Sequence, residues 1–329
     1  MFPKIMSKTI PSGNLLSRAQ FLVYRMRMLL LGKESDKGLL FKIFIYLILI
    51  DTAYIFLRPI LFMITKMITS PRDATNPVVT WVPTEIYWGH LESAWKALDY
   101  MKSLAVSVGI STVSALLTVM FCSIAGYAFA RLQIPFKRTL FTLLLFALIL
   151  PAQVTILPLM SFYTMNGMYN TVWPLLLPAF FGHGLKGALF VIIFRQFFST
   201  LPKELEEAAR IDGASVFRIY GKVILPLAQP AILVVFLFSF VWTWNDAYLP
   251  GMFMPRPDFP DVPQLSMGIE ALNSYIASLQ QNPDPSGEVF FPDLVKMAAF
   301  FLIIMPPLVL YIIAQRWFIE GVERTGLVE

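Results

Sequence analysis

The residues whose side chains are most able to bind or react lie in two short stretches of a largely apolar chain. The first is Glu207-Ala208-Ala209-Arg210-Ile211-Asp212-Gly213, followed at a fixed distance by Val223-Ile224-Leu225-Pro226. The second is Trp242-Thr243-Trp244-Asn245-Asp246, with Tyr248 two residues further on. Acids suit the positive N-terminal end of a helix, and a glycine suits the end of one. Tryptophan, amide and carboxylate groups together suit a sugar, because aromatic faces stack on its C–H surfaces and polar groups bond its hydroxyls.

Groups for covalent or metal chemistry are sparse. The 329 residues include one cysteine, Cys122, and two histidines that lie far apart in sequence, which excludes a disulfide framework and a Cys-based metal site. The phosphate-binding sequence Gly-x4-Gly-Lys-Ser/Thr is also missing, because neither Gly32-Lys33-Glu34 nor Gly221-Lys222-Val223 completes it. We expect no catalytic residue, no metal site and no cofactor on this chain. If ATP drives its activity, another polypeptide must hydrolyse it.

Two short helices and a glycine corner are predicted to carry the first stretch. Ser199 or Thr200 is a candidate cap for the first helix, which has several glutamates at its positive N-terminal end. Gly213 is placed to end that helix in the left-handed conformation. A second helix, Ala214 to about Ile224, is expected to end at Pro226. Together they predict a rigid bent lever.

The composition is that of an integral membrane protein. Hydrophobic residues make up 57% of the chain and charged residues 14%, with a mean hydropathy of +0.66. Six apolar segments are each long enough to cross a hydrocarbon core of ~30 Å. They comprise residues 39–64, 104–130, 139–163, 171–197, 228–249 and 292–315.

Several spans carry features that predict their surroundings. Asp51 and Arg58 are costly inside a bilayer, so they should face protein, for example a partner subunit. The second span is rich in small residues and should pack inside the bundle. Pro151 and Pro158 should bend the third span. Prolines and glycines interrupt the fourth, as happens where the backbone is buried or lines a cavity.

The distribution of basic residues predicts the orientation. With the N-terminus inside, the inner segments carry 17 Lys and Arg and the outer ones carry five. The net charge of +5 therefore reflects topology and not a nucleic-acid partner. Residues 1–38 should be a cytoplasmic amphipathic tail, and residues 250–291 a long proline-rich outer loop. Both termini should be cytoplasmic.

The first stretch resembles the EAA loop, E-A-A-x3-G-x9-I-x-L-P, of the membrane subunits of binding-protein-dependent ABC importers. Glu207, Ala208, Ala209, Gly213, Leu225 and Pro226 match it, and Val223 replaces the usual isoleucine. The resemblance implies that residues 199–226 form the coupling loop, which docks on an ATP-binding subunit. There Glu207 would make the contact, Ala208 and Ala209 would allow close approach, and Gly213 would form the corner.

Two further stretches resemble the carbohydrate-importing branch of this family. Trp242, Trp244, Asn245, Asp246 and Tyr248 resemble a tryptophan-asparagine-acid pattern on the fifth span, which would border the sugar path. The C-terminal sequence 315–321, Gln-Arg-Trp-Phe-Ile-Glu-Gly, resembles the tail of MalG-type subunits. The resemblance covers about residue 40 to the end. An aromatic belt at the outer interface explains the same tryptophans about equally well.

Together these resemblances imply an all-α membrane protein: six transmembrane helices in the ABC type I importer permease fold, with residues 39–329 as its domain. The chain would form half of the pathway of a sugar importer, with an oligosaccharide as substrate, in a bacterial or archaeal plasma membrane. Its partners would be a second permease, two ATP-binding subunits that hold ATP and magnesium, an extracytoplasmic solute-binding protein and lipid. The alternatives are an amino-acid permease of the same family and a secondary transporter. The missing inverted repeat argues against the latter.

Overall fold

The computed structural model describes residues 38–78, 81–182, 186–254, 264–281 and 291–326, and all regular elements within these ranges are helical. Residues Met1–Thr65 form one compact unit and Lys66–Glu329 a second. The apolar helix α2 (Leu39–Met67) occupies the first predicted span and runs through most of the described part of the first unit. Of the predicted amphipathic tail, residues 1–38, the first 37 lie outside the described residues.

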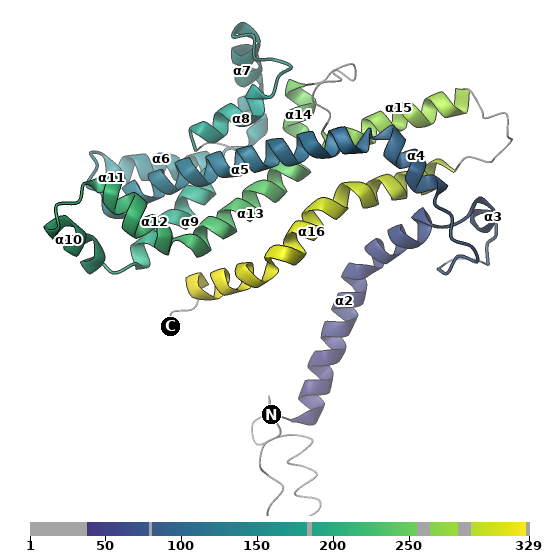
Figure 1. Cartoon of the computed structure of the whole chain (residues 1–329), viewed down its shortest axis with the longest axis horizontal. Helices are drawn as coiled ribbons and strands as arrows, with labels where there is room; N and C mark the ends of the chain where they lie inside the picture. Colours follow the sequence, from purple (N-terminus) through teal and green to yellow (C-terminus); the bar gives the residue numbers. More distant parts are fainter. Residues whose placement is uncertain (1–37, 79–80, 183–185, 255–263, 282–290, 327–329) are drawn as a thin grey trace, which may run out of the picture. The chain divides into compact units, whose positions relative to one another are not determined.

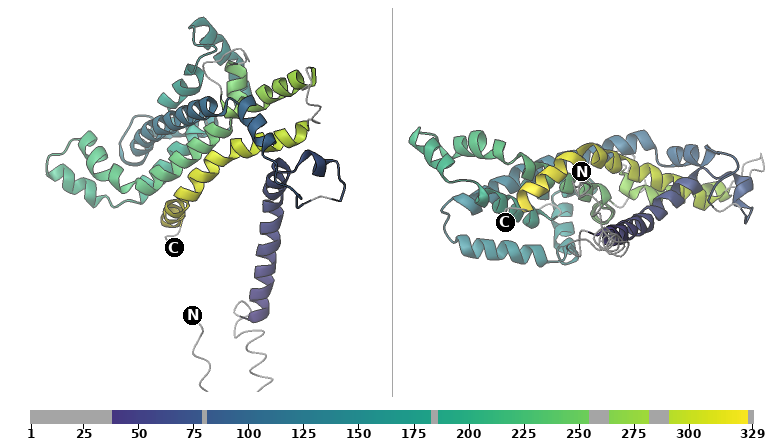
Figure 2. Two further views of the ribbon diagram at one scale, coloured as in Figure 1. Left: turned by 45° about the vertical axis from the view of Figure 1, so that its right-hand side comes forward. Right: turned by 90° about the horizontal axis from the view of Figure 1, so that it is seen from below.

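The second unit is organised around α5 (Tyr100–Arg131), a helix of 32 residues. It packs against α8 (Trp173–Phe180), α9 (Gly187–Thr200) and α13 (Gln229–Asn245), as Figures 1 and 2 show. Gly126 allows the close approach of α9, since a Cβ there would lie 2.5 Å from the Cβ of Phe194. Small polar residues fill one side of α5 and are buried. The prediction that this span packs inside the bundle is confirmed.

The main core forms where α5, α9 and α13 meet the segment between α9 and α13. Phe190, Phe194 and Phe198 supply its largest side chains from α9 and are fully buried. Aromatic rings of this size bury much of the apolar surface of a domain. The other buried members are Cys122, Tyr127, Val191, Ile219, Ile224, Ala228, Ala231 and Val235.

The third and fourth predicted spans are each divided into two helices. The third is divided into α6 (Lys137–Ile149) and α7 (Ala152–Met165), with Pro151 at the break, so the predicted bend at Pro151 is a full interruption of the helix. Pro158 lies within α7. The fourth span is divided into α8 and α9 as predicted, with Gly182 in the left-handed conformation at the break, whereas Pro178 lies within α8 and does not interrupt it.

The last helix, α16 (Pro292–Gly326), continues through Pro306-Pro307 because neighbouring side chains bind the carbonyl groups that these prolines leave free. A proline has no N–H to donate to the carbonyl four residues earlier. The Tyr100 hydroxyl donates to the Leu302 carbonyl at 3.2 Å, and the Trp244 indole Nε1 donates to the Ile303 carbonyl at 3.1 Å. These two carbonyls are four residues before Pro306 and Pro307, which have no N–H to donate to them. Side chains of α5 and α13 therefore replace the missing hydrogen bonds of α16.

The segment between α9 and α13 forms two helical parts joined by a corner, as predicted, but with different ends. Its first helix is α10 (Glu204–Ile211), which is not capped by Ser199 or Thr200. Both belong to the last turn of α9, where the Ser199 hydroxyl donates to the Arg195 carbonyl. The predicted cap was wrong because α9 continues three residues beyond the expected span.

The second part also continues beyond its predicted end at Pro226. It consists of α11 (Val216–Ile219), a π-helical turn η1 (Tyr220–Ile224) and α12 (Leu225–Leu227), and α13 follows at a bend of 79°. The Leu225 N–H donates to the Tyr220 carbonyl five residues earlier. This wider turn makes room for Pro226, whose ring would otherwise clash with the preceding turn. Pro226 therefore lies inside the helix.

The segments predicted as outer are partly helical. Residues 65–103 include α3 (Pro71–Ala74) and α4 (Gly89–Ala97), and α5 already begins at Tyr100. The predicted long loop 250–291 was wrong in part, since it contains the end of α14 (Tyr248–Phe253), a 3-10 turn η2 (Leu265–Met267) and α15 (Gly268–Gln281). Leu272 and Ile276, one turn apart on α15, are buried. These buried apolar residues on one side of α15 explain why a helix forms here, although the many prolines of the segment suggested a loop.

The structure supports fewer complete spans than the six predicted. Among the described residues, three helices are long and apolar enough to cross a membrane, α2, α5 and α16 up to Arg316. The number rises to five if α6 with α7, and α11–α12 with α13, each count as one bent span. Six crossings remain a prediction.

Candidate coupling surface and solute cavity

The glycine corner between α10 and α11 is a complete helix C-terminal motif. Gly213 has the predicted left-handed conformation, with φ of 75°. Its N–H donates to the Arg210 carbonyl and the Ala214 N–H donates to the Ala209 carbonyl, both at 3.0 Å. These two bonds define a Schellman motif, which satisfies carbonyl groups that the end of α10 would otherwise leave free. The corner is therefore fixed by backbone hydrogen bonds.

The outward side of this corner is open and partly apolar. Glu207 and Ala208 are exposed, while Ala209 is half-buried against the core. Ile211 and Phe217 are each 86% exposed, one on each side of Gly213. Large apolar side chains so exposed beside small residues are typical of a surface that another protein covers.

The inward side carries a buried ion pair. Glu206, next to Glu207 in sequence, has a side chain only 7% exposed, and its carboxylate lies 3.4 Å from Nε of Arg131 at the end of α5. Arg210, one turn further along α10, lies 3.7 Å from the same carboxylate. The Tyr127 hydroxyl donates to it at 3.5 Å. Arg131 also donates to the Phe198 and Leu201 carbonyls at the end of α9.

A second polar contact joins the π-helical turn to α5. The hydroxyls of Tyr220 and Ser123 are hydrogen-bonded at 2.7 Å. The Tyr220 ring lies 5.3 Å from the Tyr127 ring, and the Tyr127 ring lies 5.9 Å from Phe198. The three rings therefore link η1, α5 and α9.

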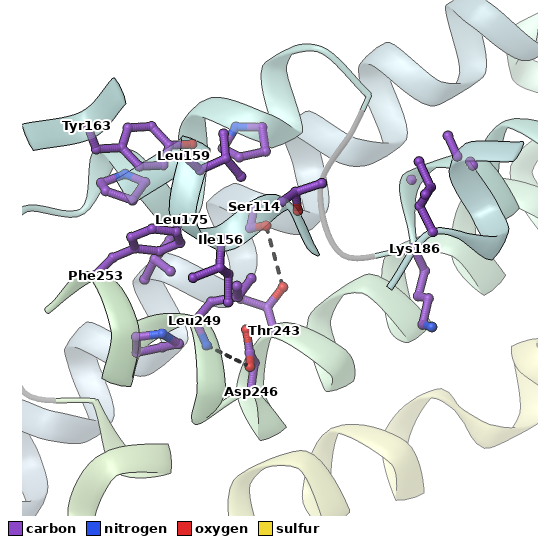
Figure 3. Close-up of a pocket in the computed structure, with 18 of the residues that line it drawn as sticks. Ser114, Ile156, Leu159, Tyr163, Leu175, Lys186, Thr243, Asp246, Leu249 and Phe253 are labelled. Carbon is purple, nitrogen blue, oxygen red and sulfur yellow. Dashed lines mark hydrogen bonds between the residues drawn. The ribbon is translucent and has the colours of Figure 1, made fainter. Parts of the chain in front are cut away.

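A cavity of about 250 Å³ lies away from this corner, among α5, α6–α9, α13 and α14. Its walls are mostly apolar. Figure 3 shows Ser114, Thr243 and Asp246 close together, with the Thr243 hydroxyl donating to Ser114 at 3.4 Å. Lys186 lies apart from these side chains. A mainly apolar cavity with a few convergent polar groups is the usual form of a small-molecule site. Thr155, Tyr163 and Gln264 also contribute to the lining.

The structure separates the residues that the sequence placed along the sugar path. Asp246 lines the cavity, and its Oδ1 also accepts hydrogen bonds from the N–H groups of Tyr248 and Leu249 at the start of α14. Trp244 is 2% exposed and binds the Ile303 carbonyl of α16. Trp242 packs on Phe190 and Phe238, with ring centroids 5.4 and 5.6 Å apart. Asn245 and Tyr248 are exposed.

Sequence reasoning assigned no site role to Arg131 or Ser114. It named Glu206 only as an acid near a helix N-terminus, and Thr243 only as a member of the 242–246 stretch. Spacing offered a partial signal, because Glu206 and Arg210 are four residues apart on a helix. Arg131 lies 75 residues before Glu206, so no local pattern joins them. The cavity residues come from helices separated by turns whose geometry the sequence leaves open.

Comparison with known proteins agrees with this architecture. A family described as binding-protein-dependent transport system inner membrane components matches residues 119–324, which include the corner and the cavity helices α8, α9, α13 and α14. A "Probable ABC transporter permease protein" of Pyrococcus horikoshii is 31% identical over 221 residues, covering 67% of this chain and 73% of that protein.

Two further similarities cover more of the chain. The sn-glycerol-3-phosphate transport system permease protein UgpE of Pectobacterium atrosepticum is 28% identical over 302 residues, covering 88% of this chain and 97% of UgpE. A crystal structure of a bacterial ABC transporter involved in the import of the acidic polysaccharide alginate contains a similar fold, with a TM-score of 0.71 and 20% identity. That match covers 87% of this chain and 98% of the other. Since the family match spans more than half of its length, this chain belongs to the binding-protein-dependent inner membrane components and is a permease of an ABC transporter.

Proposed function

We propose that this permease is one half of the membrane pathway of an ATP-driven importer for sugars or sugar-like polyols, coupled to its ATPase through α10 and α11. The observation that carries the coupling role is the corner at Gly213. It presents Glu207 and Ala208, with Ile211 and Phe217 beside them, on an exposed and rigidly bonded turn. Such a surface suits the cleft of another protein.

ATP and magnesium are expected on that partner, because the chain lacks a phosphate-binding loop. Two ATP-binding subunits, a second related permease and an extracytoplasmic solute-binding protein complete the proposed assembly. The family name supports the binding protein. The excess of Lys and Arg near α9–α12 supports a cytoplasmic position for the corner, with both termini on the same side.

The substrate class rests on the cavity and on the relatives. Ser114, Thr243 and Asp246 supply hydroxyl and carboxylate groups of the kind that bind polyols. A volume of about 250 Å³ lies below the range usual for a complete ligand site, which supports a pathway completed by a second permease. The relatives are named for sn-glycerol 3-phosphate and for osmoprotective compounds. We place Asp246, Asn245 and Tyr248 beside the path, and Trp242 and Trp244 in its supporting wall.

The coupling role is tested with the purified complex in nanodiscs. Glu207→Lys reverses a charge in the first turns of α10, where the helix dipole favours acids. We expect the variant to lose the ATP-binding subunit, with the spans still folded, as measured by subunit stoichiometry and thermal unfolding. Glu204→Lys, on an exposed position of the same helix, is the matched control. A Glu207→Lys complex of full stoichiometry with normal hydrolysis would contradict the assignment.

The substrate class is tested by hydrolysis stimulated through the binding protein. Maltotriose, sn-glycerol 3-phosphate and L-glutamine are compared at equal concentration in the same complex. Stimulation by either of the first two supports the proposal. Stimulation by L-glutamine alone supports the alternative, an amino-acid permease of the same family.

A further inference from the structure

One face of α5 holds both parts of the corner. Ser123, Tyr127 and Arg131 follow one another at intervals of four residues, so they lie in one row along the helix. Ser123 bonds Tyr220 of η1, while Tyr127 and Arg131 contact Glu206 of α10. Figure 1 shows α10–α12 at one end of α5 and α4 with α15 at the other.

We propose that Ser123, Tyr127 and Arg131 form a receiving face, through which movement of the two coupling helices enters the membrane bundle. Glu206 and Tyr220 are the fixed contacts of the coupling helices on this face. The inference rests on the proposed coupling role. It assigns the two adjacent glutamates different tasks, since Glu206 holds α10 to α5 while Glu207 faces the ATP-binding subunit.

The energetics of the Glu206–Arg131 pair favour a positional role. Both side chains are almost fully buried, at 7% and 5% exposure. Removing two charges from water costs about as much as their attraction returns, so a buried ion pair seldom adds stability over apolar residues of equal size. What it adds is a defined geometry. Arg131 pairs with the carboxylate by charge at 3.4 Å, while its hydrogen bonds go to the carbonyls of Phe198 and Leu201, so one guanidinium contacts α10 and α9 from the end of α5.

The same helix reaches the cavity. Ser114, which lines the cavity beside Thr243, is 17 residues before Arg131, or about 26 Å along an α-helix. The α5 helix has no proline between these positions. A helix without such an interruption transmits a displacement without absorbing it in a hinge. Movement received at Arg131 would therefore change the surroundings of Thr243.

The test uses Thr243→Cys as a reporter in the full complex with its ATPase, in nanodiscs. The rate of its reaction with a methanethiosulfonate reagent is compared without nucleotide and after trapping with ADP and vanadate. Native Cys122 is fully buried and serves as the unreactive background. We expect the two rates to differ by about fivefold or more, the lower end of typical coupling between sites. In Glu206→Gln the ratio should fall toward one, while the ATP-binding subunit stays bound.

Tyr220→Phe is the second test variant and is mild enough to fold. It removes one hydroxyl, and Ser123 keeps its hydrogen bond to the Met120 carbonyl. It should lower the same labelling ratio, whereas Glu204→Gln on the exposed side of α10 should leave the ratio unchanged. The inference is wrong if Glu206→Gln and Tyr220→Phe both keep the full ratio, or if Glu206→Gln releases the ATP-binding subunit as Glu207→Lys does.

Failure of the proposed function would look different. In that case the parent complex with Thr243→Cys alone would retain no ATP-binding subunit, or nucleotide would leave its labelling rate unchanged. The reporter in the parent complex therefore separates the two failures.

Discussion

Gly213 is the residue whose conformation most limits what can replace it. Its φ of 75° is one that L-residues with a branched Cβ rarely adopt. A Cβ built there would meet nothing within 4 Å, so space is not the restriction. Any cost of substitution comes from the backbone alone.

Gly213→Val is expected to weaken the corner by about 1–2 kcal/mol through this strain. It should misdirect α11 and reduce the amount of ATP-binding subunit retained in the purified complex. Gly213→Asn is the matched control, because asparagine tolerates the left-handed region. If the valine and asparagine variants retained equal amounts of the ATP-binding subunit, the corner would not require a left-handed conformation at residue 213.

Asp73, which lies outside the predicted spans, makes the stability of the fold depend on pH. The Thr84 hydroxyl and the Thr84 N–H each donate to its carboxylate at 2.7 Å, and the hydrogen bond from the hydroxyl is the main cause that lowers the pKa of Asp73. Because the folded pKa lies below the unfolded one, this carboxylate stabilises the fold above the unfolded pKa of ~3.9. That stabilisation is lost as pH falls through the lowered folded pKa.

Thr84→Val should raise the pKa of Asp73 toward its ordinary value, because it removes the strongest of these bonds. The contribution of Asp73 should then be smaller at neutral pH and should disappear at a higher pH than in the parent protein. Thermal unfolding of the detergent-solubilised protein, followed from neutral pH to below about pH 4, measures this difference. Parallel curves for parent and variant would contradict the assignment.

At the scale of elements, α16 depends on its neighbours at one point. Pro306-Pro307 frees two carbonyls, and Tyr100 and Trp244 bind them from α5 and α13. The stretch that sequence analysis linked to sugar therefore also contains a tryptophan that joins two helices. The sequence could not distinguish these roles, because the partner carbonyl lies 59 residues away in the chain.

Trp244→Phe should destabilise the bundle by about 1–3 kcal/mol, since it leaves the Ile303 carbonyl without a donor in an apolar setting. Tyr100→Phe should act in the same way on Leu302. Trp242→Phe provides the comparison, because Trp242 contacts aromatic rings and should lose less stability. The measurement is thermal unfolding of the purified protein, and equal shifts for all three variants would exclude the proposed roles of the two carbonyls.

The packing of α5 on α9 gives a second test at this scale. Gly126→Ala should cost about 1–3 kcal/mol, because the new Cβ would overlap Phe194 and force the helices apart. Gly109→Ala, on the same helix with open space around it, should be neutral or slightly stabilising. A stable Gly126→Ala protein would show that the two helices can separate at little cost.

Helix content was predictable from apolar runs, and helix ends were not. The second span, its burial and the corner at Gly213 follow from small residues and glycine at defined spacing. The extension of α9 from the expected end at residue 197 to Thr200, and the turn around Pro226, depend on tertiary contacts that no local pattern records. Helix α15 was missed because the prolines around it suggested a loop, although its apolar residues repeat every four positions.

For the whole molecule, the distribution of basic residues predicts which end of the bundle faces the cytoplasm. A cysteine at the exposed position Ser274, on α15, should react with an impermeant thiol reagent in intact cells. A cysteine at the exposed position Asp212 should react only after the membrane is opened. The reverse pattern would invert the topology and remove the coupling assignment with it.

The candidate site was predictable only in part. The exposed surface at Glu207 and Gly213 could be proposed from a linear motif, because all its residues lie within one segment. The cavity and the Glu206–Arg131 pair could not, since they join residues from separate helices. Which of two adjacent glutamates is buried depends on the azimuth of α10, and one residue changes that azimuth by about 100°.

The π-helical turn at Tyr220–Ile224 affects how the segment before α13 tolerates a change of length. Such a turn bonds each N–H to the fifth preceding carbonyl, so it holds one residue more than an α-helical turn. Deletion of Gly221 would allow an ordinary α-helix through the segment and would keep the residues on either side in nearly the same relative orientation, because the π-helical turn holds the extra residue. A deletion in the α-helical part of the segment has no such turn to compensate for it and would rotate the preceding residues by about 100° relative to α13. Within related chains, a single-residue deletion in this turn should therefore alter function less than a deletion elsewhere in α11–α13, because only the latter changes the helical phase of the residues before it.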